Sequence, residues 1–112
     1  MKAGDVALAS LPQADGVIKP RPVVLLRLIP PFDDWLVCGI STKLRHAVPG
    51  LDEIIDPSHL DFSDSGLKTT SLIRLGFVTV LSGKRFFGVL GAISLERHQR
   101  LLENLSRHLR AP

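Results

Sequence analysis

Two segments of the chain place cationic or hydroxyl side chains at the ends of apolar runs. In the first, Arg21 stands between Pro20 and Pro22, immediately before the apolar run Val23–Leu28. The pyrrolidine rings restrict the backbone on both sides, so the guanidinium must project from the rim of the expected strand. Its planar fork of N–H donors matches the oxygens of a phosphate group. A solvated charge that guards a strand edge against aggregation fits the same residues equally well.

The second segment is Val37–Lys43, where a buried strand is expected to end in the hydroxyls of Ser41 and Thr42, followed by Lys43. Hydroxyl and ammonium groups at one strand end could hold a phosphate. Hydroxyl residues at strand ends also form turns through their own side chains, without any ligand. The loop over residues 43–52 adds Arg45 and His46, so the sequence predicts a cationic loop directly after this strand.

Several other kinds of site are excluded by the residues. The chain has no Gly-Lys-Ser/Thr phosphate loop, no dinucleotide glycine fingerprint and no nucleophile elbow around a serine. No cluster of His, Asp and Glu has metal-ligand spacing, so we expect neither a metal nor a cofactor. The single cysteine, Cys38, lies inside an apolar run and is expected to be buried rather than reactive.

The first 93 residues are expected to form short strands. Apolar runs rich in Val, Ile, Leu and Phe alternate there with turns that hold the prolines and about half of the glycines. The runs are Val6–Ala9, Val23–Leu28, Trp35–Ile40, Ile54–Ile55, Leu72–Leu81 and Phe86–Ile93. Gly76 predicts a bulge or bend in a long strand. This many short strands predict a small, strongly bent antiparallel barrel. To its core we assign the aromatic residues Trp35, Phe77, Phe86 and Phe87.

The chain changes to a helical period after residue 93. Ser94 can cap a helix over residues 95–109. An apolar stripe is expected from Leu95, His98, Leu102, Leu105 and Leu109, with Leu101 at its edge. The opposite face is expected to be solvated and to carry Arg97, Arg110 and the ion pairs Glu96–Arg100 and Glu103–Arg107. We assign His98 to a packed, hydrogen-bonded position rather than to a ligand site.

The composition is that of one globular domain of 112 residues, with 45% hydrophobic and 22% charged residues. The net charge of +3 is uneven, since residues 1–66 hold 6 Lys/Arg and 9 Asp/Glu, whereas residues 67–112 hold 8 and 2. A basic C-terminal part suits a polyanionic partner or a solvated helix. No apolar stretch approaches the ~20 residues of a membrane helix, and the N-terminus lacks a signal-peptide pattern. We therefore expect a cytoplasmic protein without a membrane partner.

Taken in order, several segments resemble the MazF/PemK family of toxin endoribonucleases from bacterial toxin–antitoxin pairs. Lys2-Ala3-Gly4-Asp5-Val6 is similar to the opening strand of the family, and Lys19-Pro20-Arg21-Pro22-Val23-Val24 to its Arg-Pro-Val-Val strand. Val37–Ser41 resembles a strand that ends in Ile-Thr or Ile-Ser. The later segments that resemble the family are Gly66–Lys68, Ser71–Arg74, Thr79-Val80 and Phe87–Ser94. The likeness covers nearly the whole chain.

The resemblance implies a fold and partners. The fold is a small SH3-like antiparallel barrel with a C-terminal helix, mainly β, in a single domain over residues 1–112. The partners are single-stranded RNA, a second copy in a homodimer, and a cognate antitoxin whose flexible segment covers the RNA groove. The protein would be the toxin of such a pair, and it would cut RNA without a metal or cofactor.

The resemblance also implies roles for particular residues. Arg21 matches the catalytic arginine of the family, and Ser41 matches its catalytic Thr/Ser. Thr42 is the neighbour that could take over if the register of the loop differs by one. Some members carry an acidic residue two positions after the arginine of the Ser-x-x-Arg strand. Here that position is Gly76, so the carboxylate is missing.

The implied chemistry needs no metal, because the 2′-hydroxyl of RNA attacks the adjacent phosphorus itself. Arg21 would stabilise the added negative charge, and Ser41 would hydrogen-bond the phosphate or position the 2′-hydroxyl. His46 could act as the acid or base, although an exposed loop histidine has the same sequence signature. Phosphate contacts are expected from Lys19, Lys43, Arg45 and Arg74.

Three alternatives stay open at the level of sequence. The barrel could bind RNA without cutting it, it could resemble the CcdB family and act on DNA gyrase, or it could be a structural dimerisation module. The missing acid at Gly76 favours binding without cleavage. The Arg21-Pro22 strand, in contrast, suits the ribonuclease family better than CcdB.

Overall fold

The computed structural model describes residues 1–12, 16 and 18–112. In this part of the chain there are six strands and one α-helix: β1 (Asp5–Pro12), β2 (Ile18–Ile29), β3 (Asp34–Ser41), β4 (Glu53–Ile55), β5 (Ser71–Ser82), β6 (Phe86–Ala92) and α1 (Leu95–Arg110). Short 3₁₀ turns are η1 (Leu44–His46), η2 (Ser63–Ser65) and η3 (Gly83–Arg85). Residues 13–15 and 17, between the end of β1 and the start of β2, lie outside the described part.

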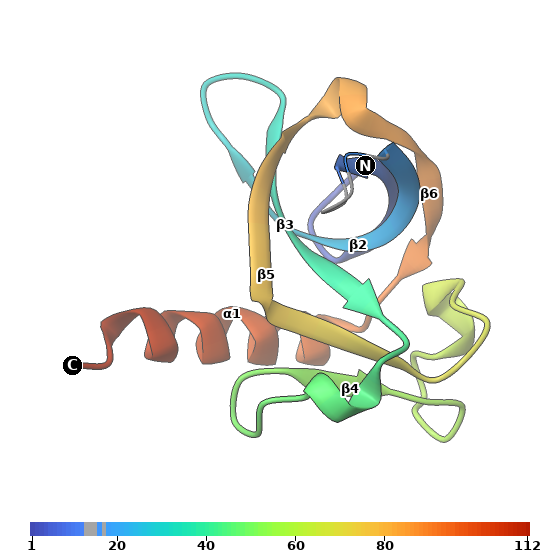
Figure 1. The fold of residues 1–112 in the computed structure, drawn as a ribbon, viewed down its shortest axis with the longest axis vertical. Helices are drawn as coiled ribbons and strands as arrows, with labels where there is room; N and C mark the ends of the chain where they lie inside the picture. The colour runs from blue at the N-terminus through green and yellow to red at the C-terminus, as the bar shows by residue number, and fades with distance from the viewer. Residues whose placement is uncertain (13–15, 17) are drawn as a thin grey trace.

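All six strands form one antiparallel sheet in the order β4-β5-β3-β2-β1-β6. Figure 1 shows the sheet curling strongly, with α1 running along one side of it. The predicted fold class, mainly β with a C-terminal helix and a barrel-like sheet, is confirmed. The sheet does not close into a complete barrel, because β4 and β6 remain at its two edges.

The central strands are buried on both faces, which explains why they are continuously apolar in sequence. Along β2, all four residues of Val23–Leu26 are fully buried. Val24 and Leu26 belong to a cluster that also contains Leu101 of α1. Val23 and Leu25 point to the opposite face, into a second cluster with Trp35 of β3. The curled sheet therefore has one core against the helix and another within its own curl.

The bend predicted from Gly76 is a bulge in β5. Arg74 pairs with Gly39 of β3, but the next residue of β3, Cys38, pairs with Val78. Residues 75–77 are therefore looped out between two adjacent positions of the ladder. The backbone N–H of Leu75 donates to Asp52 Oδ1 over 2.8 Å, so this bulge is anchored to the preceding loop.

The aromatic residues divide between core and surface. Trp35 is buried and Phe86 packs partly against the same cluster, as predicted. Phe77 and Phe87, which were assigned to the core, are 41% and 65% exposed. For Phe77 the reason is the bulge, which displaces the side chain from the regular ladder. Phe87 lies on β6, an edge strand with β1 as its sheet neighbour.

The helix begins at Leu95 as predicted, and Ser94 Oγ accepts the N–H of Arg97 over 3.1 Å. The predicted apolar stripe is correct at His98 and Leu105 but wrong at its two ends. The buried residues of α1 are Arg97, His98, Leu101 and Leu105, whereas Leu95 and Leu109 are 66% and 72% exposed. The buried face is shifted because Arg97, expected to be solvated, is buried against Glu53 of β4 and Asp61 of the loop between β4 and β5. No helix of the described residues has the length and apolar composition needed to span a membrane.

His98 occupies the packed position expected for it, with its Nε2 donating to the carbonyl oxygen of Leu26 over 2.9 Å. This bond attaches the first turn of α1 directly to β2.

Two glycines allow the loop that contains η2 to rest on the main chain of β6. Gly66 ends η2 with a φ of +75°, and a Cβ there would overlap the carbonyl oxygen of Leu90. A Cβ on Gly91 would overlap the carbonyl oxygen of Asp64 in the same way. The two backbone segments are thus in direct contact, and glycine is required at both positions.

Candidate functional site

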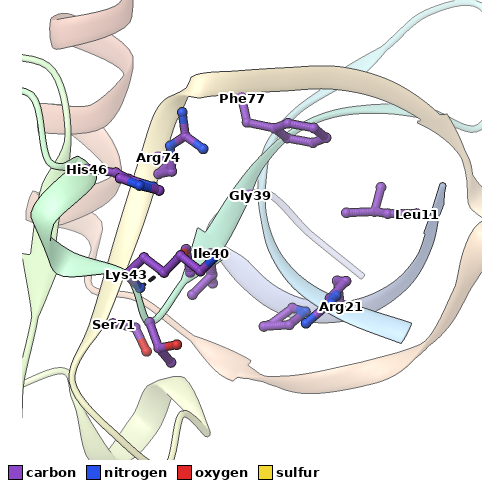
Figure 2. Close-up of a pocket in the computed structure, with 12 residues that line it drawn as sticks. Leu11, Arg21, Gly39, Ile40, Lys43, His46, Ser71, Arg74 and Phe77 are labelled. Atoms are coloured by element: carbon purple, nitrogen blue, oxygen red, sulfur yellow. Dashed lines mark hydrogen bonds between the residues drawn. The ribbon is translucent and has the colours of Figure 1, made fainter. Parts of the chain in front are cut away.

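A cleft of about 490 Å³ opens where β2, β3 and β5 meet the loop after β3. It is lined by Leu11, Arg21, Pro22, Gly39, Ile40, Ser41, Thr42, Lys43, His46, Ser71, Arg74 and Phe77. None of these described lining residues is an aspartate or glutamate. Figure 2 shows the cationic side chains reaching into this space from different elements. The cleft is therefore a cationic hollow with polar and apolar walls.

Strand register explains why Arg21 and Ser41 share the cleft. The recorded pairing of β2 with β3 ends at Val23 opposite Gly39. Arg21 and Ser41 each lie two residues beyond that pair, and side chains two residues apart point to the same face of a strand. Both residues line the cleft. Ser41 is half-buried and Arg21 is exposed.

The hydroxyl of Ser41 also forms the turn that the sequence suggested. Its Oγ accepts the backbone N–H of Lys43 over 3.0 Å. The same oxygen keeps a second lone pair, and its own O–H is available as a donor. Turn formation and a place in the cleft are thus compatible. Thr42 and Lys43 are exposed and complete this wall.

His46 enters the cleft from η1, and Asp52 fixes the loop that carries it. Asp52 Oδ2 accepts the N–H of Val48 over 2.9 Å, while Oδ1 accepts the N–H of Leu75 in the β5 bulge. One carboxylate thus joins the wall with His46 to the wall with Arg74. Asp52 was not predicted as a site residue, because nothing in its local sequence indicates a contact with a strand more than twenty residues away.

Arg74 and Phe77 form the β5 wall. Arg74 is half-buried, and its buried Nε has no hydrogen-bond partner among the described residues. Phe77 was missed as a cleft residue because it was assigned to the core. A signal existed in the sequence: Gly76 directly precedes it, and glycine inside a strand pattern indicates a bulge.

Six of the eight predicted site residues line the cleft: Arg21, Ser41, Thr42, Lys43, His46 and Arg74. Lys19 and Arg45 are exposed and are not among its lining residues. Lys19 pairs with Leu11 and lies two residues before Arg21, on the same face of β2. Arg45 is the neighbour of His46 on η1. Both could meet a long ligand outside the cleft.

Cys38 takes no part in the cleft. It is fully buried in the helix-side core, and burial raises the pKa of its thiol to about 12. The prediction of an inert, buried cysteine agrees with this position. The described residues also contain no group of three or more His, Cys, Asp or Glu side chains that could hold a metal ion. Of the two histidines before β5, only His46 lines the cleft. His59 lies elsewhere, and its Nδ1 accepts the backbone N–H of Asp56 over 3.0 Å.

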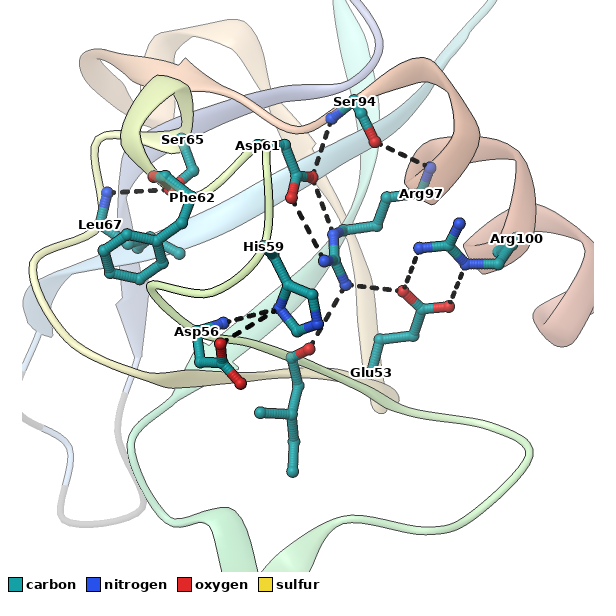
Figure 3. Close-up of polar contacts among 11 residues, drawn as sticks. Glu53, Asp56, His59, Asp61, Phe62, Ser65, Leu67, Ser94, Arg97 and Arg100 are labelled. Atoms are coloured by element: carbon teal, nitrogen blue, oxygen red, sulfur yellow. Dashed lines mark hydrogen bonds and ion pairs between the residues drawn. The ribbon is translucent and has the colours of Figure 1, made fainter.

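A second polar cluster, shown in Figure 3, attaches α1 to β4 and to the loop between β4 and β5. Arg97, which is 4% exposed, donates through Nε to Asp61 Oδ2 and through Nη1 to Glu53 Oε1, each over 2.8 Å. Asp61 also accepts the N–H of Ser94 over 3.0 Å. Arg100 pairs with Glu53, in place of the Glu96 pair that was predicted.

The charges of this cluster stabilise one another. Burial alone would raise the pKa of Asp61, but the hydrogen bonds from Arg97 and from the Ser94 amide lower it to about 2. The hydrogen bond with Glu53 raises the pKa of Arg100. Every carboxylate here already has an arginine partner, so the cluster holds the helix in place and has no group available for chemistry.

The family of the chain follows from a comparison with known proteins. The profile described as "PemK-like, MazF-like toxin of type II toxin-antitoxin system" matches residues 2–109. The chain belongs to the PemK/MazF toxin family. A comparison with curated proteins found no match.

Two solved structures illustrate the shared PemK/MazF fold. The Mycobacterium tuberculosis toxin MazF-mt6 aligns with a TM-score of 0.71 and 18% identity, over 96% of this chain and 98% of its own. A mycobacterial endoribonuclease in complex with its cognate antitoxin aligns with a TM-score of 0.70 and 14% identity, over 100% and 97% of the two chains. At these identities the likeness concerns the fold alone.

Proposed function

We propose that this PemK/MazF-family toxin is a metal-independent endoribonuclease that cuts single-stranded RNA. The observation that carries the proposal is the cleft itself. It gathers Arg21, Lys43, Arg74 and His46 around the hydroxyls of Ser41 and Thr42, without a carboxylate among its described lining residues. Such a hollow attracts a phosphodiester and offers donors to its oxygens.

The proposed reaction uses the substrate's own nucleophile. The 2′-hydroxyl oxygen bonds to the adjacent phosphorus and loses its proton, while the bond from phosphorus to the 5′-oxygen breaks. The products are a cyclic 2′,3′-phosphate and a 5′-hydroxyl that has gained a proton. The protein must therefore accept one proton, donate another and stabilise extra negative charge on the phosphate.

Arg21 suits charge stabilisation. A guanidinium remains protonated at any physiological pH, so it is a poor base but a dependable donor to a phosphorane oxygen. Ser41 would bind a phosphate oxygen or orient the 2′-hydroxyl, and Thr42 would take this role if the register of the loop differed by one residue. His46 is the lining residue best suited to proton transfer near neutral pH.

The remaining cations would position the strand. Lys43 and Arg74 lie in the cleft, and Lys19 and Arg45 would meet phosphates on either side of it. Contacts of this kind give affinity without reading the sequence of bases. The missing acid fits this scheme: a Cβ at Gly76 would lie 3.5 Å from Arg74 Nη2, so a carboxylate there could pair with Arg74. Without it, Arg74 is left for the substrate.

The proposal includes the partners of a toxin of this type. The structurally similar mycobacterial endoribonuclease was solved with its cognate antitoxin. We infer that this chain acts in the cytoplasm, forms a homodimer and is neutralised by an antitoxin that covers the cationic cleft. An acidic or extended antitoxin segment would compete with RNA for the same cations.

The decisive experiment incubates the purified protein with long single-stranded RNA in excess EDTA. We expect cleavage, and we expect Arg21→Ala to reduce its rate by about a hundredfold or more, the usual loss for one preorganised donor. Its melting temperature should stay near that of the parent protein, since Arg21 is exposed. Arg110→Ala, an exposed arginine at the end of α1, is the matched control and should cut normally.

Each other result identifies an alternative. Salt-sensitive RNA binding without products would replace the nuclease by a binding module. Inhibition of gyrase supercoiling, with RNA left intact, would favour the CcdB-like function. Unimpaired cleavage by Arg21→Ala would contradict the role given to this arginine.

A further inference from the structure

We propose that Phe77, together with Gly39 and Arg74, forms a subsite in which one base of single-stranded RNA stacks on the aromatic ring. The inference rests on the proposed function, because it concerns the same cleft and the same class of substrate. It adds a binding determinant that contacts the base, whereas the residues discussed so far contact phosphate or ribose.

The exposure of Phe77 has a specific structural origin. A phenylalanine in a long apolar strand would normally be buried, yet Phe77 is 41% exposed and lines the cleft. The β5 bulge brings it there, since Arg74 and Val78 oppose adjacent residues of β3 and the intervening residues are looped out. The anchoring bond from Leu75 to Asp52 holds that bulge in place. The anchored backbone of the bulge therefore holds the ring in the cleft, so its exposure is not incidental.

Gly39 provides the place for the ring. A Cβ at position 39 would lie 3.1 Å from Cδ1 of Phe77, closer than ordinary van der Waals contact. The ring therefore packs on the bare backbone of β3. Figure 2 shows it projecting from β5 over the cleft, on the side away from His46 and Lys43. An aromatic ring in a cleft is a stacking platform for any base, because every base has a π-face.

Arg74 supplies the charge that a nucleotide needs beside its base. It stands opposite Gly39 in the ladder, and its buried Nε has no partner among the described residues. The guanidinium lines the cleft, so its other N–H groups can donate to a phosphate beside the base. The combination of ring and guanidinium matches a nucleotide, whose base is planar and whose phosphate is anionic. An apolar peptide would leave that guanidinium unsatisfied, so RNA is the occupant favoured here.

The test measures binding separately from cleavage. Short 2′-O-methyl RNA strands lack the attacking hydroxyl, and their affinity can be compared with that of abasic strands with the same phosphates by fluorescence anisotropy. We expect the parent protein to bind the base-containing strand at least about fivefold more tightly, the lower end for one stacked base. Phe77→Leu should lose this preference and Phe77→Tyr should keep it. Phe87→Leu, an exposed phenylalanine outside the cleft, is the matched control and should keep it too.

A second measurement does not depend on the stability of the leucine variant. In Phe77→Trp, the base-containing strand should quench the new tryptophan and the abasic strand should not, while Trp35 stays buried in both cases. Equal affinity for the two strands, or an unchanged preference in Phe77→Leu, would overturn the subsite. The protein could also prefer the base-containing strand through Phe77 and yet cut no RNA. That result would contradict the nuclease proposal and support the subsite.

Discussion

Two cationic residues of the cleft, Lys43 and Arg74, differ in their exposure to solvent. Lys43 is exposed at the end of a turn that Ser41 closes, whereas Arg74 is half-buried at the edge of a bulge. A phosphate bound between them would meet one mobile, hydrated ammonium and one preorganised guanidinium. We expect Arg74 to determine geometry and Lys43 to contribute mainly attraction at a distance.

His46 is the residue whose role is most easily separated from simple charge. If it transfers a proton, His46→Ala should lower the rate of RNA cleavage by about a hundredfold or more, as is usual for general acid–base catalysis. Affinity for a 2′-O-methyl strand should change little, because the lost group acts on the reaction rather than on binding. His108→Ala, an exposed histidine of α1, is the control. A loss of affinity equal to the loss of rate would reduce His46 to a phosphate contact.

The positions of Ser41 and, in part, Arg21 could be predicted from sequence because their constraints are local. The end of an apolar run marks Ser41 as the last residue of β3. Flanking prolines restrict the backbone at Arg21, but β2 already begins at Ile18, so Arg21 lies within the strand and not at its end as predicted. Asp52 and Phe77 could not be assigned in this way. Their positions depend on which residue of β5 opposes which residue of β3, and that pairing results from long-range packing. Gly76 indicated an irregularity, but it did not indicate that the following phenylalanine would face a cleft.

At the scale of elements, α1 is attached by polar groups at its N-terminus and by apolar groups further along. The existence, start and cap of the helix were predictable from Ser94 and the change of period. Its buried face was not, because hydrophobic patterning treats arginine as solvated. Arg97 is buried because it pairs with Glu53 and Asp61, each over 2.8 Å, and these partners lie on β4 and in the loop after it, distant in sequence.

This cluster predicts how the protein responds to acid. The pKa of Asp61 is lower in the folded chain, at about 2, than its ordinary value of 3.8. Such a carboxylate stabilises the fold above its ordinary pKa, and this contribution is lost as the pH falls toward the folded pKa. We expect the free energy of unfolding to fall between about pH 4 and pH 2. Urea denaturation at several pH values would measure it.

Asp61→Asn provides the comparison. It should be less stable at neutral pH and should decline less across that acidic window, because the titrating group is gone. Asp64→Asn, an exposed carboxylate in the same loop, should follow the parent protein. If the free energy of unfolding of Asp61→Asn fell with pH as steeply as that of the parent protein, other groups would be responsible for the acid sensitivity.

At the scale of the whole molecule, a net charge of +3 understates the attraction that we expect for RNA, because cations gather around one cleft. For a non-cleavable single strand, the logarithm of the association constant should fall linearly with the logarithm of salt concentration. Each phosphate contact adds about 0.7 to the slope. Lys43→Ala and Arg74→Ala should each reduce the slope by about that amount, and Arg107→Ala on α1 should not. A slope near zero would argue against phosphate binding.

The backbone contacts of Gly66 with Leu90 and of Gly91 with Asp64 make the toxin vulnerable far from its cleft. A methyl group on either glycine would lift the η2 loop from β6, and Asp61 on that loop would move with it, away from Arg97. Cells that survive overexpression should therefore carry two kinds of allele. Changes at Arg21 would leave the amount of toxin in the cell unchanged, whereas changes at either glycine would leave little of it. An immunoblot of the surviving cells would therefore distinguish alleles that lose activity from alleles that lose the fold.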